Sequence, residues 1–160
     1  MAKVFLTKLG DRCDSDYERA VLDDLTARGV NYKYEHTDGK FFYQTPVQSG
    51  LCLACDHNKV VQRRYRTLDI VLENGIVVEI KGRLTGTIRT FMRELIKQNQ
   101  DVDIRFFFMQ DGWQNQKTKK RTYGDWANAQ GIKWAVGDPR ANEGTVARGV
   151  GGIPQEWIDE

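Results

Sequence analysis

Residues 67–82 read TLDIVLENGIVVEIKG, and this stretch decides the fold class. Two apolar runs, residues 68–72 and 76–80, are separated by a short polar segment that contains Asn74 and Gly75. Asn-Gly between two such runs is the strongest short-range signal of a β-hairpin. The stretch therefore predicts two adjacent antiparallel strands.

Three residues of this hairpin carry chemistry. Asp69 lies on the first strand, and Glu79 and Lys81 lie near the end of the second. Residues two apart on a strand leave the same face, and the partner strand can bring Asp69 beside them. Carboxylate oxygens suit Mg²⁺, which activates water and neutralises charge on a phosphodiester. Lys81 would stabilise the developing oxyanion, although such spacing is also common in surface ion pairs.

Residues upstream of the hairpin predict one helix and two strands. Ser15 to Glu18 has the Ser-x-x-Glu form of a capping box, and apolar residues at helical spacing follow it, so we expect a helix over 15–28. Residues 30–35 alternate apolar and polar types and predict a strand. Residues 41–47 are aromatic with a proline near their end and predict an exposed strand.

Residues downstream of the hairpin alternate between helical and extended patterns. The predicted elements are a helix over 87–98, a strand over 102–109, a helix over 123–130 and a strand over 132–136. Residues 137–152 are rich in glycine and lack periodicity, so they predict a surface loop or a mobile segment. Residues 153–158 are expected to pack back through Trp157. The pattern predicts one α/β domain over residues 1–160, with a central mixed sheet flanked by helices.

Composition narrows the class of protein. The 160 residues are 40% hydrophobic and 29% charged, which suits a folded domain. No apolar run approaches the roughly 18 residues that a membrane span needs, and no secretory signal is evident. Three cysteines, an odd number, favour a reducing compartment over a disulfide framework. We therefore expect a cytoplasmic protein without a membrane partner.

Charge is unevenly distributed along the chain. Residues 59–121 hold 14 basic and 7 acidic side chains, and the other 97 positions hold 10 basic and 15 acidic ones. A basic centre can be a DNA-binding surface or an ordinary solvated one. The candidate DNA-binding residues are Arg63, Arg64, Arg83, Arg89, Arg93, Lys117, Lys119 and Lys120. Tyr65 and Trp113 could stack on exposed bases, but packing in the core or at its rim is the commoner use of such side chains.

Cys52, Cys55 and His57 form a second local pattern. Two cysteines at this spacing are half of a structural zinc site. The other half is missing, although His36 and Cys13 could complete four ligands. Zn²⁺ is therefore possible but not favoured, and we expect reduced cysteines and well under one zinc ion per chain.

The stretch 67–82 resembles the motif of the PD-(D/E)xK nuclease superfamily, and more closely that of the bacteriophage endonuclease I family, the Holliday-junction resolvases. Further matches follow in the family's order, at residues 15–35, at 101–108, and at 122–135 together with 153–158. One departure is Leu68, which replaces the proline before the first aspartate. Proline supplies no metal ligand, so the departure leaves the chemistry in place.

The resemblance implies a restriction-endonuclease-like core and a Mg²⁺-dependent endonuclease that cuts branched DNA, with Mn²⁺ as a substitute ion. Glu18, Asp69 and Glu79 would be the metal ligands, and Lys81 the catalytic lysine. By sequence alone Glu18 is also the N3 member of the capping box and needs no catalytic role. The resemblance further implies a homodimer that exchanges residues 15–48 between subunits, so that each active site is composite.

Two alternatives stay open at the level of sequence. The same residues would serve a nicking or restriction-like endonuclease acting on linear duplex DNA. A non-catalytic DNA-binding module, with or without zinc, would use the acidic cluster only for structure. Cleavage of branched and linear substrates would distinguish the linear-duplex enzyme from a junction resolvase. A requirement for a metal ion would distinguish a nuclease from the non-catalytic module. The family further suggests the cytoplasm of a phage-infected bacterial cell.

Overall fold

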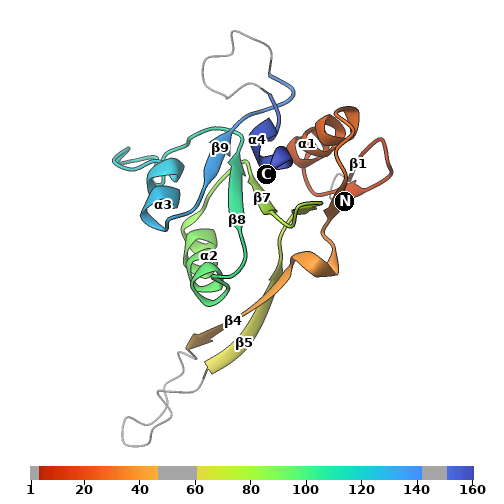
Figure 1. Cartoon of the computed structure of the whole chain (residues 1–160). Helices are drawn as coiled ribbons and strands as arrows, with labels where there is room; N and C mark the ends of the chain where they lie inside the picture. Colours follow the sequence, from red (N-terminus) through yellow and green to blue (C-terminus); the bar gives the residue numbers. More distant parts are fainter. Residues whose placement is uncertain (1–3, 47–60, 142–150) are drawn as a thin grey trace, which may run out of the picture.

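A five-stranded mixed sheet forms the centre of the protein (Figure 1). The computed structural model describes residues 4–46, 61–141 and 151–160. In spatial order the sheet contains β3 (Tyr32–Tyr34), β6 (Ile70–Leu72), β7 (Val77–Lys81), β8 (Ile104–Phe108) and β9 (Trp134–Val136). Strand β6 is antiparallel to β3 and β7, whereas β7, β8 and β9 are mutually parallel. The predicted mixed sheet is confirmed.

The hairpin predicted from Asn74 and Gly75 joins β6 to β7. Ile70 pairs with Val78 in the antiparallel register. Gly75 has φ +87°, in the left-handed region that a residue without Cβ adopts at no steric cost. The turn chemistry therefore sets which residues of the two strands face each other.

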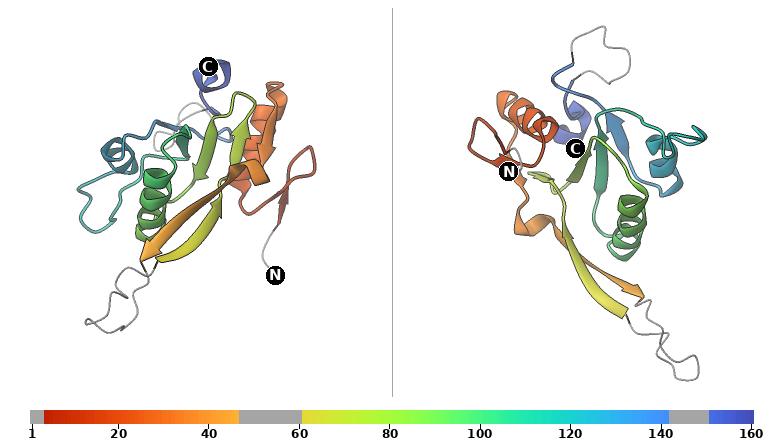
Figure 2. Two further views of the ribbon diagram at one scale, coloured as in Figure 1. Left: turned by 60° about the horizontal axis from the view of Figure 1, so that its bottom comes forward. Right: turned by 180° about the vertical axis from the view of Figure 1, so that it is seen from behind.

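In the described residues, helices cover both faces of the sheet (Figure 2). On one face α1 (Asp16–Ala27) and α4 (Gln155–Asp159) pack on a core that includes Phe107. On the other face α2 (Gly86–Gln98) and α3 (Tyr123–Ala129) pack on a core that includes Phe106 and Phe108. Consecutive residues of β8 thus point to opposite layers, as strand geometry requires, and all five β8 residues are buried. The predicted flanking helices are confirmed.

Helix α1 is tied to the segment that follows β9. The Tyr17 hydroxyl donates to the carbonyl of Gly137 at 2.8 Å. At the far end of the helix, Arg28 Nη1 donates to the carbonyl of Ile153 at 2.7 Å. Arg140 Nη1 lies 2.9 Å from Asp16 Oδ2. Segments more than 100 residues apart therefore hold both ends of α1.

The structure contains elements that the sequence patterns did not predict. These are β1 (Phe5–Leu6), β2 (Arg12–Cys13), η1 (Thr37–Gly39) and β5 (Val61–Thr67). Strand β5 pairs along its whole length with β4 (Lys40–Pro46), and together they form an arm that projects from the body (Figures 1 and 2). The sequence of β5 is rich in basic residues and shows no clear alternation of apolar and polar types, so its pattern does not predict a strand.

Side chains at the end of α2 fasten this arm to the body. Gln98 Oε1 accepts from the Gln44 amide at 2.8 Å, and Gln98 Nε2 donates to the Gln44 carbonyl at 3.0 Å. Asn99 Nδ2 donates to the Phe42 carbonyl at 3.0 Å. These bonds satisfy backbone groups on the open edge of β4, which a lone hairpin would leave to solvent.

The glycine-rich segment 137–152 was predicted as a loop or mobile segment. Its described start, residues 137–141, contains a fully buried Asp138 that pairs with Arg140 at 2.8 Å. This part is therefore an ordered turn packed on the core, and residues 142–150 lie outside the described residues. The predicted packing of Trp157 is confirmed, since its side chain is 5% exposed.

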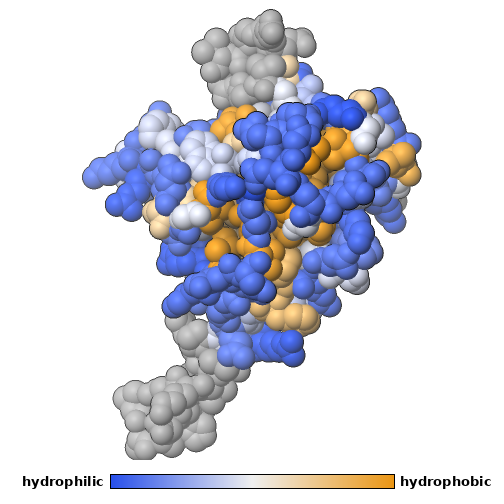
Figure 3. All heavy atoms as spheres, viewed as in Figure 1, coloured by the Kyte–Doolittle hydropathy of each residue, from blue (hydrophilic) through white to orange (hydrophobic). Residues whose placement is uncertain are grey.

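The surface in Figure 3 shows apolar residues in the middle of one face, between α3 and α1, framed by hydrophilic ones. In the parts of the chain that the structure describes, no helix combines the length and the apolar character that crossing a membrane requires.

Candidate active site

The β6–β7 hairpin brings Asp69, Glu79 and Lys81 together. Asp69 directly precedes β6, and its Oδ2 accepts from the Ile80 amide on β7 at 2.7 Å. The Asp69 amide in turn donates to Glu79 Oε2 at 3.3 Å. Lys81 Nζ lies 2.7 Å from Glu79 Oε1 and 3.4 Å from Asp69 Oδ2. The convergence expected from the spacing of these residues is present in the structure.

This cluster is buried and contains two carboxyl groups for one ammonium group. The side chains of Asp69 and Lys81 are each 13% exposed, and that of Glu79 is 1% exposed. Burial, and then the charge of Glu79, raise the pKa of Asp69 well above its usual range. Burial alone would lower the pKa of Lys81, but the charges of Glu79 and Asp69 outweigh it and raise that pKa. One ammonium group is therefore shared by two carboxylates.

Glu18 lies beside this cluster, in the first turn of α1. Together with Lys81 and Arg83 it lines a pocket of about 480 Å³. Its Oε1 accepts from the Ser15 hydroxyl at 2.9 Å, and its Oε2 accepts from the Tyr34 hydroxyl at 3.1 Å. Glu18 thus serves the helix cap and faces the pocket at once. The structure contains one chain, so the exchange of residues 15–48 between subunits stays a prediction.

The donor set can be compared with what a divalent cation requires. Within residues 4–46, 61–141 and 151–160, no group of three or more His, Cys, Asp or Glu side chains is arranged to hold a metal ion. Asp69 and Glu79 supply two adjacent carboxylates, and buried Glu79 Oε1 makes no hydrogen bond of good geometry. Mg²⁺ retains several waters and binds through one or two carboxylates. The pair fits such an ion, while Glu18 as a third ligand stays a prediction.

Two charged residues near the site were missed by the sequence patterns. Glu35 donates its amide to the Asp69 carbonyl at 2.8 Å. Burial, and then the charges of Asp14, Glu18 and Glu79, raise its pKa. Arg140 lines the same pocket as Lys81. Glu35 is placed by the pairing of β3 with β6, and Arg140 by the turn after β9, and neither placement has a local sequence signal.

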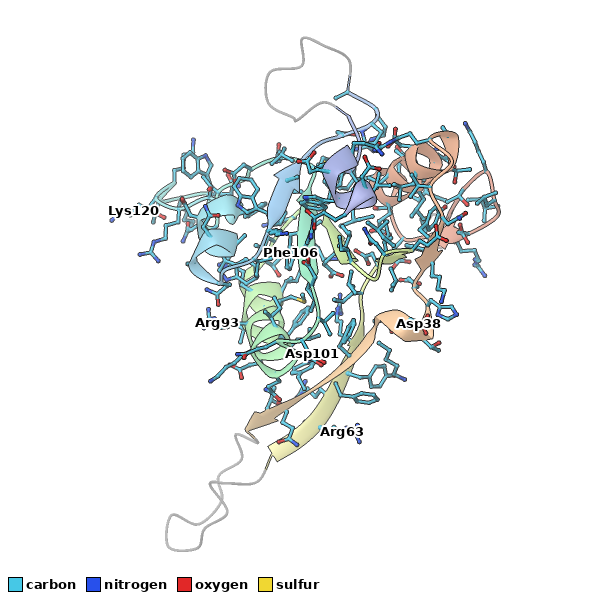
Figure 4. All side chains as sticks on the ribbon, in the orientation of Figure 1. Asp38, Arg63, Arg93, Asp101, Phe106 and Lys120 are labelled. Atoms are coloured by element: carbon cyan, nitrogen blue, oxygen red, sulfur yellow. The ribbon has the colours of Figure 1, made fainter. Side chains whose placement is uncertain are left out.

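The candidate DNA-binding residues come from several elements, and Figure 4 labels three of them: Arg63 on β5, Arg93 on α2 and Lys120 on the loop after β8. Arg83 lines the pocket of the acidic cluster. Arg89 donates to the Leu84 carbonyl at 2.9 Å and braces the start of α2. Arg93 lines a separate cavity of about 620 Å³. The remaining candidates lie on β5 (Arg63 and Arg64) and on the exposed loop after β8 (Lys117, Lys119 and Lys120).

The two aromatic candidates are not core residues. Tyr65 is 61% exposed and Trp113 is 38% exposed. Neither ring is therefore buried in the core, and packing at the rim of the core, the other part of the expectation, stays a prediction. The possible zinc ligands Cys52, Cys55 and His57 lie outside the described residues. Cys13 is buried in the core, and burial raises the pKa of its thiol to about 11.

A mixed sheet flanked by helices, with Asp, Glu and Lys gathered on its central hairpin, defines the nuclease class to which the sequence motif pointed. The family profile of phage endonuclease I matches residues 2–138, and the chain belongs to this family. It is 29% identical over 146 residues to Endonuclease I of Escherichia phage T7, covering 91% of this chain and 78% of that protein. Family membership makes the protein an endonuclease and sets aside the non-catalytic DNA-binding module.

Proposed function

We propose that the protein is a Mg²⁺-dependent, structure-selective endonuclease that cleaves phosphodiester bonds in branched DNA, as a Holliday-junction resolvase does. The observation that carries this proposal is the buried cluster of Asp69, Glu79 and Lys81 beside a solvent-accessible pocket. Its place of action would be the cytoplasm of a phage-infected bacterial cell.

Each residue of the cluster has a distinct task. When bound, Mg²⁺, or Mn²⁺ in its place, would supply positive charge against the phosphodiester and make water a better nucleophile. Asp69 and Glu79 would hold the ion, and the Ile80 amide fixes the orientation of the Asp69 carboxylate at 2.7 Å. Lys81 would donate a hydrogen bond to the oxygen on which charge develops. Glu18 would add a third carboxylate to the ion, and Arg83 would contact the substrate phosphate at the mouth of the pocket.

Selectivity for branched DNA is proposed to depend on a homodimer. Resolving a four-way junction requires two cuts on strands held in a fixed relation, and two identical sites around a two-fold axis stand at one constant separation. The likeness to junction resolvases supports this assembly. The runner-up is a nicking or restriction-like enzyme that uses the same residues on linear duplex DNA.

Cleavage of matched substrates tests the proposal. A labelled four-way junction and a linear duplex of the same arm sequence are incubated with the protein, with and without Mg²⁺. We expect cleavage of the junction only with Mg²⁺ or Mn²⁺, and much slower cleavage of the duplex. Equal rates on both substrates would favour the linear-duplex alternative, and cleavage in the presence of a chelator would rule out the metal requirement.

A mixed dimer tests whether the site is composite. If α1 is exchanged, a dimer of a Glu18→Ala chain and a Glu79→Ala chain keeps one intact site and nicks one strand. If α1 stays with its own chain, both sites of that dimer are broken. Nicking by the purified mixed dimer is the expected result, and its absence, or a monomer in analytical ultracentrifugation, would contradict the exchange.

A further inference from the structure

The arm formed by β4 and β5 carries two aromatic side chains on its solvent face. Phe42 is 44% exposed and Tyr65 is 61% exposed. The two residues pair across the strands, and their ring centroids lie 6.1 Å apart at an angle of 58°. Exposed aromatic pairs of this kind are typical of surfaces that meet a partner. Neither ring contributes to the two cores.

Cations lie over both rings. Lys40 Nζ is 3.9 Å from the centroid of Tyr65, and Arg63 Cζ is 4.1 Å from the centroid of Phe42. We call Lys40, Phe42, Arg63 and Tyr65 the hairpin platform. The two strands contain four basic residues and no acidic one. This charge suits an anionic partner.

The hairpin platform is held in place from behind. On the opposite face of the arm Tyr43 is 7% exposed and packs in the core under α2. Arg66 Cζ lies 4.7 Å from the ring centroid of Phe91, a residue of α2. With the Gln98 and Asn99 bonds to β4, these contacts fix the backbone that presents the aromatic rings. In Figure 4, Arg63 lies on the side of the arm away from Arg93 and α2.

The hairpin platform lies close to the acidic cluster along the chain. Tyr65 precedes Asp69 by four residues. At about 3.3 Å per residue of extended strand, this spacing is at most roughly 13 Å, or about four base-pair steps of 3.4 Å. A DNA strand whose phosphate lies at Asp69 can therefore reach the rings.

We infer that the hairpin platform binds unpaired bases of the DNA substrate, which stack on Phe42 and Tyr65 while Lys40 and Arg63 contact the flanking phosphates. Base stacking on aromatic side chains is independent of sequence, because every base has a π face. The inference rests on the proposed action on branched DNA, since a branch point exposes base faces that a continuous duplex covers. On this inference the hairpin platform recognises the branch point, and the pocket beside Asp69, Glu79 and Lys81 cleaves the DNA.

If residues 15–48 are exchanged, Lys40 and Phe42 come from one chain and Arg63 and Tyr65 from the other, and the hairpin platform keeps the same four side chains. The alternative occupant of its solvent face is a further copy of this face in another molecule. In a two-fold contact the hairpin platform would face itself and bring Lys40 and Arg63 of one copy against the same cations of the other. Such like-charge contacts oppose association. DNA supplies the opposite charge together with flat apolar surfaces, and it is the occupant we propose.

Binding measured with a chelator tests this inference without cleavage. The probes are a four-way junction and a linear duplex with a one-base bulge, each with a normal base or an abasic site at the branch or bulge. Phe42→Leu with Tyr65→Leu should weaken binding of the base-containing probes about tenfold or more. On the abasic probes the wild type and this variant should bind alike, as a double-mutant cycle requires.

A matched control keeps the rings and changes only the hydroxyl groups. Phe42→Tyr with Tyr65→Phe should bind all probes as the wild type does. Thermal melting should be unchanged in both double variants, because the side chains are exposed. Ultraviolet crosslinking of 5-iododeoxyuridine at the bulge should attach DNA to peptides that contain Phe42 or Tyr65.

Three outcomes separate the possibilities. Equal affinities of the wild type and the leucine variant for base-containing probes would overturn the inference. A leucine variant that binds DNA normally but loses self-association in ultracentrifugation would assign the hairpin platform to an interface between copies and also overturn it. If the base-dependent coupling appears on the bulge while the wild type shows no preference for junctions, the inference holds and the proposed junction selectivity fails.

Discussion

Two ionic clusters, each built around one Asp, one Glu and a basic residue, are centred on the neighbouring strands β7 and β8, and they differ in which groups are buried. At the end of β7, Asp69 and Glu79 share Lys81, and both carboxylates are buried. Near the start of β8, two other carboxylates share one guanidinium. Here Arg105 is 0% exposed, whereas Asp103 and Glu160 are 44% and 45% exposed.

The two clusters differ in which group is desolvated by burial: the carboxyl groups at β7, and the guanidinium group at β8. Hydrogen bonds from Arg105 hold the pKa values of Asp103 and Glu160 below their usual range. Its guanidinium also lies 5.3 Å from the Trp157 ring centroid, so this cluster fastens α4 to the sheet. At Asp69, burial and the charge of Glu79 instead raise the pKa of the carboxyl group. A carboxyl group with a strongly raised pKa beside a pocket is typical of a functional site.

Substitution at the acidic cluster should have the largest effect. Glu79→Ala or Lys81→Ala should reduce junction cleavage by at least about 100-fold, because they remove the proposed metal ligand or the cation proposed to stabilise the transition state. Both variants should bind the junction about as tightly as the wild type does. The control is Lys133→Ala, which removes an exposed cation 3.4 Å from Glu160 and should leave cleavage near the wild-type rate. Cleavage within tenfold of wild type in both site variants would contradict the site.

Stability should respond in opposite directions at the two clusters. Arg105→Leu should lower the free energy of unfolding by about 2 kcal/mol, because it removes charged hydrogen bonds to two carboxylates. Asp69→Asn should raise it by about 0.5–1 kcal/mol while abolishing cleavage, because it removes a buried like charge. Urea denaturation at pH 7 with a chelator measures both changes. Equal losses in the two variants would show that the clusters do not differ as described.

The smallest effect should be the loss of stability in acid at the Arg105 cluster. A carboxylate with a depressed folded-state pKa contributes stability that is present above its unfolded pKa and is lost as the pH falls through the folded value. The unfolded values of Asp103 and Glu160 are about 3.9 and 4.3. The melting-temperature gap between wild type and Arg105→Leu should therefore narrow from pH 7 to pH 3. A gap that stays constant would mean that these carboxylates add nothing.

Local chemistry predicted much of the fold. The helix expected over 15–28 is observed at Asp16–Ala27, with Ser15 as its N-cap, and the Asn-Gly turn lies where the sequence places it. Both signals are complete within a few residues. Strand β5 is different, because its basic side chains give no local strand signal and its extended structure depends on pairing with β4. The pairing of β1 with β2 is likewise too short to leave a periodic signal.

The residues of the candidate site also fall into those with a local sequence signal and those placed by contacts between distant segments. Asp69, Glu79 and Lys81 lie on one hairpin, so strand periodicity sufficed to bring them together. Glu35 reaches the site through the pairing of β3 with β6, and Arg140 through a contact with Asp16 that spans 124 residues. Contacts between segments so far apart depend on the tertiary fold, and one sequence without relatives does not display them.

The ties between α1 and the segment after β9 also have a consequence for synthesis. Ribosomes extend chains at about 5–20 residues per second, so Arg28 is made roughly 6–25 seconds before its partner Ile153. Until then α1 lacks the contacts that hold both its ends. The pocket that Tyr17, Glu18 and Arg140 line together is therefore assembled only after residues 137–153 have been made.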